Sequence, residues 1–339
     1  MSNPYKKFPD QSFWTRTISL GSILGLGDVD RPYLKKDDKV VSMGSCFAAN
    51  MVPQLLSSGI KYVFSERIPS QLHPRVKNYN YESFSARYGN IYTTRQMLQL
   101  LQRSLGVFES IAEPWIENNK YIDPYRPGIS FPAESLDEYR FVIQNHLICV
   151  KNAIAEATVL VITLGLTEAW SDVETGAIFP ACPGTIAGQF NPKKHQLIQL
   201  GVDEVFQDLI EIDNAIRSIN PEIEILLSVS PVPLVATATN DHVLVANTYS
   251  KSVLRVAASN FVNAVDNARY IPAYEIITGP QAPDSYFESS RRDVSQQGIN
   301  AVMAHFLGGL QFSETSSDPI EKFNILKVEC EEEVQGHGR

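Results

Sequence analysis

The order of apolar and amphipathic segments predicts an α/β protein, a three-layer α/β/α sandwich on a doubly wound, mainly parallel sheet of five strands. Two observations support this fold class. Segments with strand character alternate with segments of helical spacing, as in parallel sheets whose strands are joined by helices. The segment TVLVITLG at 158–165 is apolar and β-branched, as expected of a strand buried on both faces. The five predicted strands are residues 39–43, 60–66, 158–165, 222–233 and 269–277.

The predicted domain opens with a strand, a sharp turn and a helix. The first strand runs into Gly44-Ser45-Cys46, and residues 47–56 have helical character. A polar loop over 67–90 follows the second strand, and loops of this length are uncommon inside a domain unless they build a site.

Apolar residues at helical spacing predict five further helices. Thr94 is the expected N-cap of the first of these helices, Gly106 its expected end, and Ser295 the expected N-cap of the last one. A small hairpin or lid is expected at 167–184, directly after the third strand. The helices are predicted at residues 93–106, 135–156, 202–219, 242–262 and 294–310.

Composition excludes several classes of partner. The 339 residues carry a net charge of −9 with no Lys/Arg-rich block, which argues against nucleic acid and against anionic membrane surfaces. No apolar run approaches the roughly 18 residues needed for a membrane span. The N-terminal residues lack the apolar region of a secretory signal. The scattered cysteines predict reduced thiols, so we expect a cytoplasmic protein. The sequence does not determine the oligomeric state, and it is compatible with a homo-oligomer.

The cysteines and glycines predict neither a metal site nor a cofactor. Cys46, Cys149, Cys182 and Cys330 are scattered without CxxC spacing, so a disulfide framework and a zinc knuckle are not expected. The glycine-rich segment at 21–28 precedes the first strand and lacks the Lys-Ser/Thr pair of a phosphate-binding loop.

Three regions are predicted from composition. Residues 1–37 form an extension rich in Pro, Gly and charge, and its aromatic residues Phe13, Trp14 and Tyr33 are expected to dock on the core. Residues 38–312 form the α/β domain, and 313–339 form a polar, acidic tail.

Chemistry-bearing residues follow three of the predicted strands. They are the turn at 44–46, the segment Gly165-Leu166-Thr167-Glu168, and Ser230-Pro-Val-Pro at 230–233. Ligands of doubly wound sheets bind at the carboxyl ends of the strands, so we expect these segments to converge in one crevice. Cys46 and Ser45 are the candidate nucleophiles, because a helix N-terminus lowers a thiol pKa. The alternatives are a buried Cys46 that only packs and a Ser45 that caps the helix.

Several blocks resemble those of the GSCFA family. They are GSCFA at 44–48, ARYGNIYT at 86–93, TLGLTEAW at 163–170, SPVP at 230–233 and NTYSKSVL at 247–254. The resemblance covers roughly residues 38–310. The family is grouped with the SGNH, or GDSL-type, hydrolases, so it implies a flavodoxin-like α/β/α fold and action on esters or acyl transfer.

The resemblance assigns roles to residues of these blocks. The nucleophile turn of SGNH enzymes resembles Gly44-Ser45-Cys46, with Cys46 at the nucleophile's place and Ser45 at that of the aspartate. The second block resembles Gly89 with Asn90, where the glycine N–H helps to bind the oxyanion. The third block resembles Gly165 to Glu168, with Thr167 in place of the oxyanion-binding asparagine and Glu168 in place of the aspartate beside it.

The last block departs from the family pattern. The sequence Ser290-Arg291-Arg292-Asp293 takes the place of D-x-x-H, so both triad partners are missing there. Asp293 as a base would need a raised pKa, which the neighbouring arginines oppose.

A base must then come from another part of the chain. His242, beside Asp241 after the SPVP strand, is the favoured candidate, and a helix-capping histidine is the alternative. His73 also falls on the site side of the sheet, and His195 follows the expected lid, whereas His146 is mid-helix at the other end of the sheet.

Further residues are candidates for binding substrate. Arg87 and the two arginines at 291 and 292 suit a carboxylate, phosphate or sulfate, although solvated arginines are the plainer interpretation. Ser290 and Asp293 are candidates by their position in the last block. Tyr92, Trp170 and Phe179 are suited to wall an acyl or sugar pocket, unless they belong to the core. Cys182 is a candidate to lie opposite Cys46 across the expected lid, and a buried thiol is its alternative.

Two functions follow from these residues. The first is an acyl-ester or thioester hydrolase, or an O-acyltransferase, that acts on small molecules such as acylated glycans or lipids through Cys46 or Ser45. The second is a non-catalytic, SGNH-like binding protein with a degenerate triad.

Overall fold

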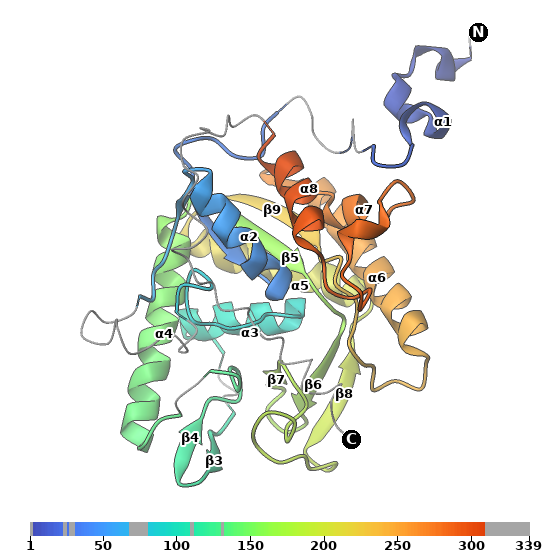
Figure 1. Ribbon diagram of the computed structural model, residues 1–339. Coiled ribbons are helices and arrows are strands. Elements are labelled where there is room, and N and C mark those ends of the chain that lie inside the picture. Colours follow the sequence, from blue (N-terminus) through green and yellow to red (C-terminus); the bar gives the residue numbers. More distant parts are fainter. Residues whose placement is uncertain are drawn as a thin grey trace.

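A five-stranded parallel sheet forms the centre of the protein, as a computed structural model that describes residues 3–22, 26, 31–67, 81–108, 112–129 and 132–308 shows (Figure 1). The strand order is β10-β9-β5-β1-β2, and every neighbouring pair is parallel. In chain order of the sheet's own strands this is 2-1-3-4-5, the flavodoxin-like doubly wound order, which confirms the predicted fold class. The strands are β1 (Lys39–Met43), β2 (Lys61–Tyr62), β5 (Val159–Leu164), β9 (Glu224–Val229) and β10 (Ala268–Tyr270).

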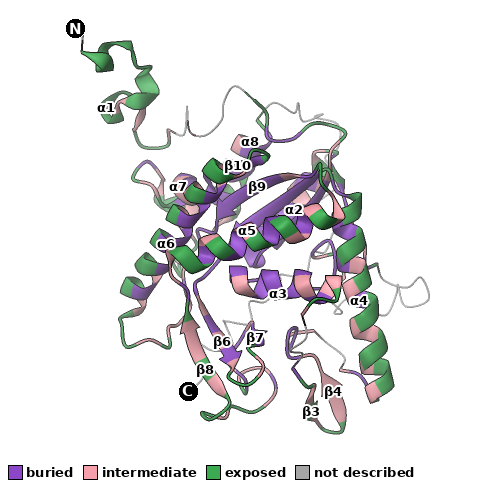
Figure 2. Cartoon of the chain, turned by 180° about the vertical axis from the view of Figure 1, so that it is seen from behind, coloured by how far each residue is buried: buried purple, intermediate pink, exposed green. Residues whose placement is uncertain are grey.

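Helices cover both faces of the sheet (Figure 2), and alternate residues of β1, β5 and β9 enter two separate cores. Val41 of β1 packs in the core under α3, α4, α5 and α6, whereas its neighbour Val40 packs in the core under α2, α7 and α8. This alternation follows from the two-residue period of a strand, and it explains why the strands read as continuously apolar. The helices are α2 (Cys46–Ser57), α3 (Thr94–Leu105), α4 (Leu136–Glu156), α5 (Val202–Ile219), α6 (Val243–Ala264), α7 (Ala273–Thr278) and α8 (Gln296–Phe306).

The N-terminal region contacts the body of the protein unevenly. Tyr33 is buried in the core of α2 and α8, but Trp14 is 66% exposed and Phe13 is half-buried. The short helix α1 (Trp14–Thr17) stands away from the sheet, after two 3₁₀ turns, η1 (Pro4–Lys7) and η2 (Asp10–Ser12) (Figure 1). Of the three aromatic residues expected to dock, Tyr33 is therefore the one that is buried.

The last predicted strand, 269–277, was placed wrongly in part. β10 ends at Tyr270, and α7 begins at Ala273, directly after Pro272. An apolar run of this length does not distinguish a buried strand from a buried helix, and Pro272 cannot donate a ladder hydrogen bond. Helix α3 is capped by Thr93, whose side chain accepts from the Gln96 N–H, and not by Thr94.

Two small antiparallel sheets lie beyond the carboxyl ends of the central strands. β6 (Glu168–Asp172) pairs with β7 (Ile178–Phe179), within the hairpin expected at 167–184. A third strand, β8 (His195–Gln199), was not predicted and pairs with the other side of β6. The second sheet, which consists of β3 (Trp115–Glu117) and β4 (Lys120–Ile122), was also missed. A 3₁₀ turn before α8, η3, covers Asp284–Tyr286.

Parts of some predictions fall outside the described residues. These are most of the polar loop at 67–90, with His73, and the tail at 313–339. Within the described ranges, no helix is both long and apolar enough to cross a membrane.

Candidate active site

The turn between β1 and α2 brings Cys46 to the first position of a helix. Gly44 has a φ of +157° and lies against β5, where a Cβ would come within 2.9 Å of the Thr163 carbonyl oxygen. Only glycine therefore fits this turn without a shift of the neighbouring strand. Cys46 begins a helix of 12 residues and is 9% exposed. The N–H groups in the first turn of a helix carry a partial positive charge.

Ser45 occupies the N-cap position of α2 but does not cap it. Its side chain makes no capping hydrogen bond, and the residue is 4% exposed. The capping role considered for Ser45 from the sequence is therefore absent. A buried hydroxyl next to Cys46 remains in the turn.

The Gly89–Tyr92 segment is tied to this turn by backbone hydrogen bonds. The Ile91 N–H donates to the Gly44 carbonyl over 2.9 Å. Gln96 of α3 holds the segment from the other side, since its Nε2 donates to the Asn90 carbonyl and its Oε1 accepts from the Tyr92 N–H, each over 2.9 Å. Sequence reasoning missed Gln96, whose only signal was a polar residue on the buried side of an amphipathic helix.

The Gly165–Thr167 segment joins the same assembly. The Leu166 N–H donates to the Tyr92 carbonyl over 2.8 Å, and a Cβ on Gly165 would come within 2.9 Å of that same oxygen. Two consecutive residues of α6 also hold this segment: Lys251 Nζ donates to the Gly165 carbonyl over 2.8 Å, and Ser250 Oγ accepts from the Thr167 N–H over 3.1 Å. Two of the predicted segments, 44–46 and 165–168, are therefore joined through residues 89–92 at the carboxyl ends of β1 and β5. The third predicted segment, 230–233, follows β9, and its Ser230 N–H donates to the Leu164 carbonyl of β5 over 2.8 Å.

Both backbone groups of Thr167 are engaged in hydrogen bonds, which leaves its side-chain hydroxyl as a further donor. The Thr167 N–H is used by Ser250, and the Thr167 carbonyl accepts from the Leu200 N–H. Among the described residues, Thr167 Oγ1 is fully buried and has no hydrogen-bond partner. Such a donor is available to a group that enters the site.

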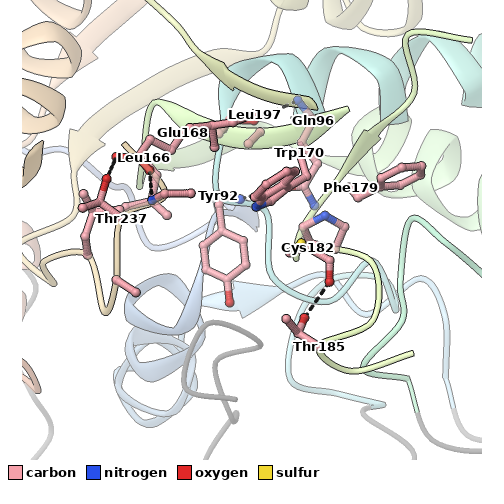
Figure 3. Close-up of a pocket in the computed structure, with 16 residues that line it drawn as sticks. Tyr92, Gln96, Leu166, Glu168, Trp170, Phe179, Cys182, Thr185, Leu197 and Thr237 are labelled. Atoms are coloured by element: carbon pink, nitrogen blue, oxygen red, sulfur yellow. Dashed lines mark hydrogen bonds between the residues drawn. The ribbon is translucent and has the colours of Figure 1, made fainter. Parts of the chain in front are cut away.

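A pocket of about 170 Å³ opens beside this assembly, between β6, β7 and the loop that follows β9 (Figure 3). Tyr92, Trp170 and Phe179 supply its aromatic surface, and Tyr92 and Phe179 also belong to buried clusters. Their binding of an acyl or sugar group stays a prediction. Cys46 is not among the residues that line it, so the pocket adjoins the turn through Tyr92 and Leu166. The lining residues are Tyr92, Thr93, Gln96, Leu166, Glu168, Ala169, Trp170, Phe179, Pro180, Cys182, Thr185, Leu197, Leu234, Ala236, Thr237 and Ala238.

Glu168 places a carboxylate in the lining of this pocket, and two hydrogen bonds hold that carboxylate in position. Its Oε1 accepts from Thr237 Oγ1 over 2.8 Å, and its Oε2 accepts from the Ala238 N–H over 3.2 Å. Each carboxylate oxygen can accept a further hydrogen bond from a bound molecule. Cys182 also lines the pocket, and burial raises the pKa of its thiol.

The favoured base, His242, lies at the N-cap of α6. Its Nδ1 accepts from the Leu244 N–H over 3.1 Å, and the residue is exposed. His242 therefore caps helix α6, which is the role that the sequence offered as the alternative to a catalytic base. His195 lies on β8 with its Nδ1 accepting from the Asn191 N–H, and partial burial lowers its pKa.

Ser290 and Asp293 lie together in an exposed turn before α8. Ser290 Oγ donates to Asp293 Oδ2 over 3.3 Å, and Arg292 forms an ion pair with Asp293 over 3.6 Å. These residues thus pair with one another where the family pattern places an acid and a base.

Arg87 is buried away from the pocket lining. Its guanidinium packs 4.1 Å from the ring centroid of Tyr81, and the backbone N–H of Arg87 donates to Glu66 Oε2 over 2.8 Å. Glu66 also forms a buried pair with His146 over 2.7 Å. Burial lowers the pKa of His146 to about 4, and the bond to His146 lowers the pKa of Glu66 to about 2 against the opposing effect of burial.

This pair was missed because its members are 80 residues apart. The described part of the chain contains no group of three or more His, Cys, Asp or Glu residues placed to hold a metal ion.

Similarity to known proteins lies in a family profile and in solved structures of low sequence identity. No curated protein matches the chain. Among solved structures, an acetyl esterase variant crystallised with acetate is similar at 9% identity and a TM-score of 0.36, covering 80% of this chain and 95% of that chain. A carbohydrate esterase family 3 protein from Talaromyces cellulolyticus is similar at 11% identity and a TM-score of 0.35, with the same two coverages. The profile of the GSCFA family matches residues 39–306, so the chain belongs to the GSCFA family.

Proposed function

We propose that the protein is an acyl-ester or thioester hydrolase, or an O-acyltransferase, with Cys46 as its nucleophile. The Cys46 thiolate adds to the substrate carbonyl carbon, and the bond to the alcohol or thiol leaving group breaks as that group takes up a proton from solvent. Water or an acceptor hydroxyl then attacks the enzyme thioester and gives up its proton to solvent, which releases the acid or the new ester and restores the thiolate.

One observation carries this proposal: three chain segments are hydrogen-bonded into a single assembly around the N-terminus of α2. The Cys46 thiol lies at that terminus, where the helix dipole stabilises a thiolate. The N–H groups of Cys46 and Gly89, with the Thr167 hydroxyl or the Asn90 amide, are the proposed donors to the oxyanion. A thiolate needs less help from a base than a serine hydroxyl does, which fits the replacement of D-x-x-H.

The adjoining pocket favours a compact substrate. Its volume of about 170 Å³ is below the roughly 300–1,000 Å³ of sites for drug-sized ligands. Trp170 and Tyr92 offer apolar surface, and Glu168 accepts hydrogen bonds from hydroxyl groups. A short acyl ester of a sugar or another small alcohol matches this lining.

The second candidate is a binding protein without turnover. The mutual hydrogen bond of Ser290 and Asp293, at the place of the triad acid and base, favours it. In that case the pocket would bind an acylated ligand, and Cys46 would only pack beneath the turn.

Thiol reactivity and acylation separate the two candidates. We expect iodoacetamide to alkylate Cys46 at neutral pH faster than Cys149 and Cys182, whose thiol pKa values are raised by burial. Intact-mass spectrometry with short-chain esters and thioesters should detect an acyl group that Cys46→Ala abolishes. Ser45→Ala is the matched variant and should retain acylation. Unchanged turnover in Cys46→Ala would remove Cys46 from the mechanism.

A further inference from the structure

Ser250 and Lys251 stand out as polar residues in the interior of the protein. They are consecutive on α6, and they are 0% and 1% exposed. Burying an ammonium group is unfavourable unless polar groups replace its water. The Gly165 carbonyl, 2.8 Å from Lys251 Nζ, is such a group, and it lies at the end of β5 beside the pocket.

The segment after β5 is held by side chains and by neighbouring loops. Lys251 binds the Gly165 carbonyl, Ser250 binds the Thr167 N–H, and the Tyr92 carbonyl binds the Leu166 N–H. Three successive residues are thus fixed by hydrogen bonds, two of them from a single turn of α6. The position of the Thr167 hydroxyl is set by these bonds.

The bond from Lys251 also acts beyond Gly165. A charged donor on the Gly165 carbonyl polarises the peptide group that Gly165 shares with Leu166. Polarisation strengthens the Leu166 N–H as a donor to the Tyr92 carbonyl, because hydrogen bonds in a chain reinforce one another. That bond joins the third segment to the second, and Ile91 joins the second to Gly44.

We propose that Lys251 and Ser250 are positioning residues for the reaction, a role that rests on the proposed function. They fix the Thr167 hydroxyl and the Tyr92 loop relative to Cys46, and they place a positive charge one peptide group behind the oxyanion side of the site. Loss of either side chain therefore slows acylation of Cys46 and leaves the intrinsic reactivity of its thiol unchanged.

The test compares acylation with alkylation in the full-length protein. Lys251→Met removes the charge and keeps an apolar stem of similar length, and Ser250→Ala is a milder second variant. Ser252→Ala is the control, because Ser252 is exposed on the same helix and binds only the helix's own Thr248 carbonyl in the described structure.

We expect kcat for a short-chain ester to fall by about tenfold to a hundredfold in Lys251→Met, the range of small displacements at a reacting centre, with KM nearly unchanged. Ser250→Ala should give a smaller loss. Iodoacetamide alkylation of Cys46 should stay within about twofold in both variants, and Lys251→Arg should recover part of kcat. Acylation at the wild-type rate in Lys251→Met, or equal losses of acylation and alkylation, would overturn the proposal.

Amide hydrogen exchange keeps this result separate from the fate of the proposed function. We expect faster exchange at Leu166 in Lys251→Met and at Thr167 in Ser250→Ala, and no change there in Ser252→Ala. If the wild-type protein acquires no acyl group while exchange at these amides changes in the variants, the proposed reaction fails and only the structural role of Lys251 and Ser250 stands. Unchanged exchange together with normal acylation in the variants would reject that structural role as well.

Discussion

At the scale of single residues, Cys46 differs from the other described cysteines by its position at a helix N-terminus. Cys149 and Cys182 are both partly buried, and burial raises their pKa values because a thiolate loses hydration there. Cys46 is more buried than either, and it is the first residue of α2. Its chemistry therefore depends on the direction of the helix and on the glycine that allows the turn.

The buried pair of Glu66 and His146 should make stability depend on pH. The His146 pKa falls from 6.5 to about 4 on folding, so between these values the unfolded chain binds a proton that the native protein does not. The Glu66 pKa falls from 4.5 to about 2, which acts in the same direction at lower pH. The contribution of this pair to stability is therefore expected to be complete above about pH 6.5 and to decrease as the pH falls through these ranges.

Urea unfolding at pH 7, 5.5 and 4.5 would measure this dependence. We expect His146→Gln to be less stable than the wild type at pH 7 but to lose less stability between pH 7 and 4.5. His242→Gln, at an exposed helix cap, is the control and should follow the wild-type slope. If the free energy of unfolding of His146→Gln fell with pH as steeply as that of the wild type, other groups would be the cause of the acid sensitivity.

At the scale of secondary-structure elements, the site depends on how closely the strand ends approach their neighbours. Gly44 lies against Thr163 of β5, and Gly165 lies against the Tyr92 carbonyl. The hydrogen bonds Ile91 to Gly44 and Leu166 to Tyr92 form at these same approaches. A side chain at either glycine would push apart the segments that the site requires.

Gly44→Ala should destabilise the protein more than Gly106→Ala does. Gly106 has a φ of +72°, and no other atom lies within 4 Å of the place that a Cβ would take, so alanine there costs only left-handed strain, about 1–2 kcal/mol. Gly44→Ala adds a 2.9 Å approach to the Thr163 oxygen, which must force β1 and β5 apart. Chemical denaturation of both variants gives the comparison, and an equal or smaller loss in Gly44→Ala would contradict it.

At the scale of the whole molecule, two cores on opposite faces of one sheet support the site. The core under α2 and α8 includes Tyr33, from the N-terminal region, whose hydroxyl donates to the Tyr270 carbonyl over 3.1 Å. Residues earlier in the chain, such as Trp14 and Leu20, are largely exposed. The predicted domain boundary at residue 38 thus separates Tyr33 from a core to which Tyr33 contributes. The position of this boundary stays a prediction.

Removing residues 1–19 should therefore leave stability nearly unchanged, within about 0.5 kcal/mol. Tyr33→Ala should cost about 3 kcal/mol, because it opens a cavity beside Phe306 and removes the bond to Tyr270. Thermal and urea unfolding of both proteins test this contrast. A large loss on truncation would show that the first helix packs on the body in solution.

Sequence alone determined the α/β/α class, the strand at β5, and the three strand-end segments, because apolar periodicity and turn residues are local signals. It did not separate strand from helix at 269–277, where a short apolar run suits both, and it gave no signal for the pairing of β8 with β6. Tertiary structure decided which distant polar groups meet: Glu66 with His146, and Gly165 with Lys251, which is 86 residues away. Packing around the whole sheet sets such contacts, and no local preference of the chain encodes them.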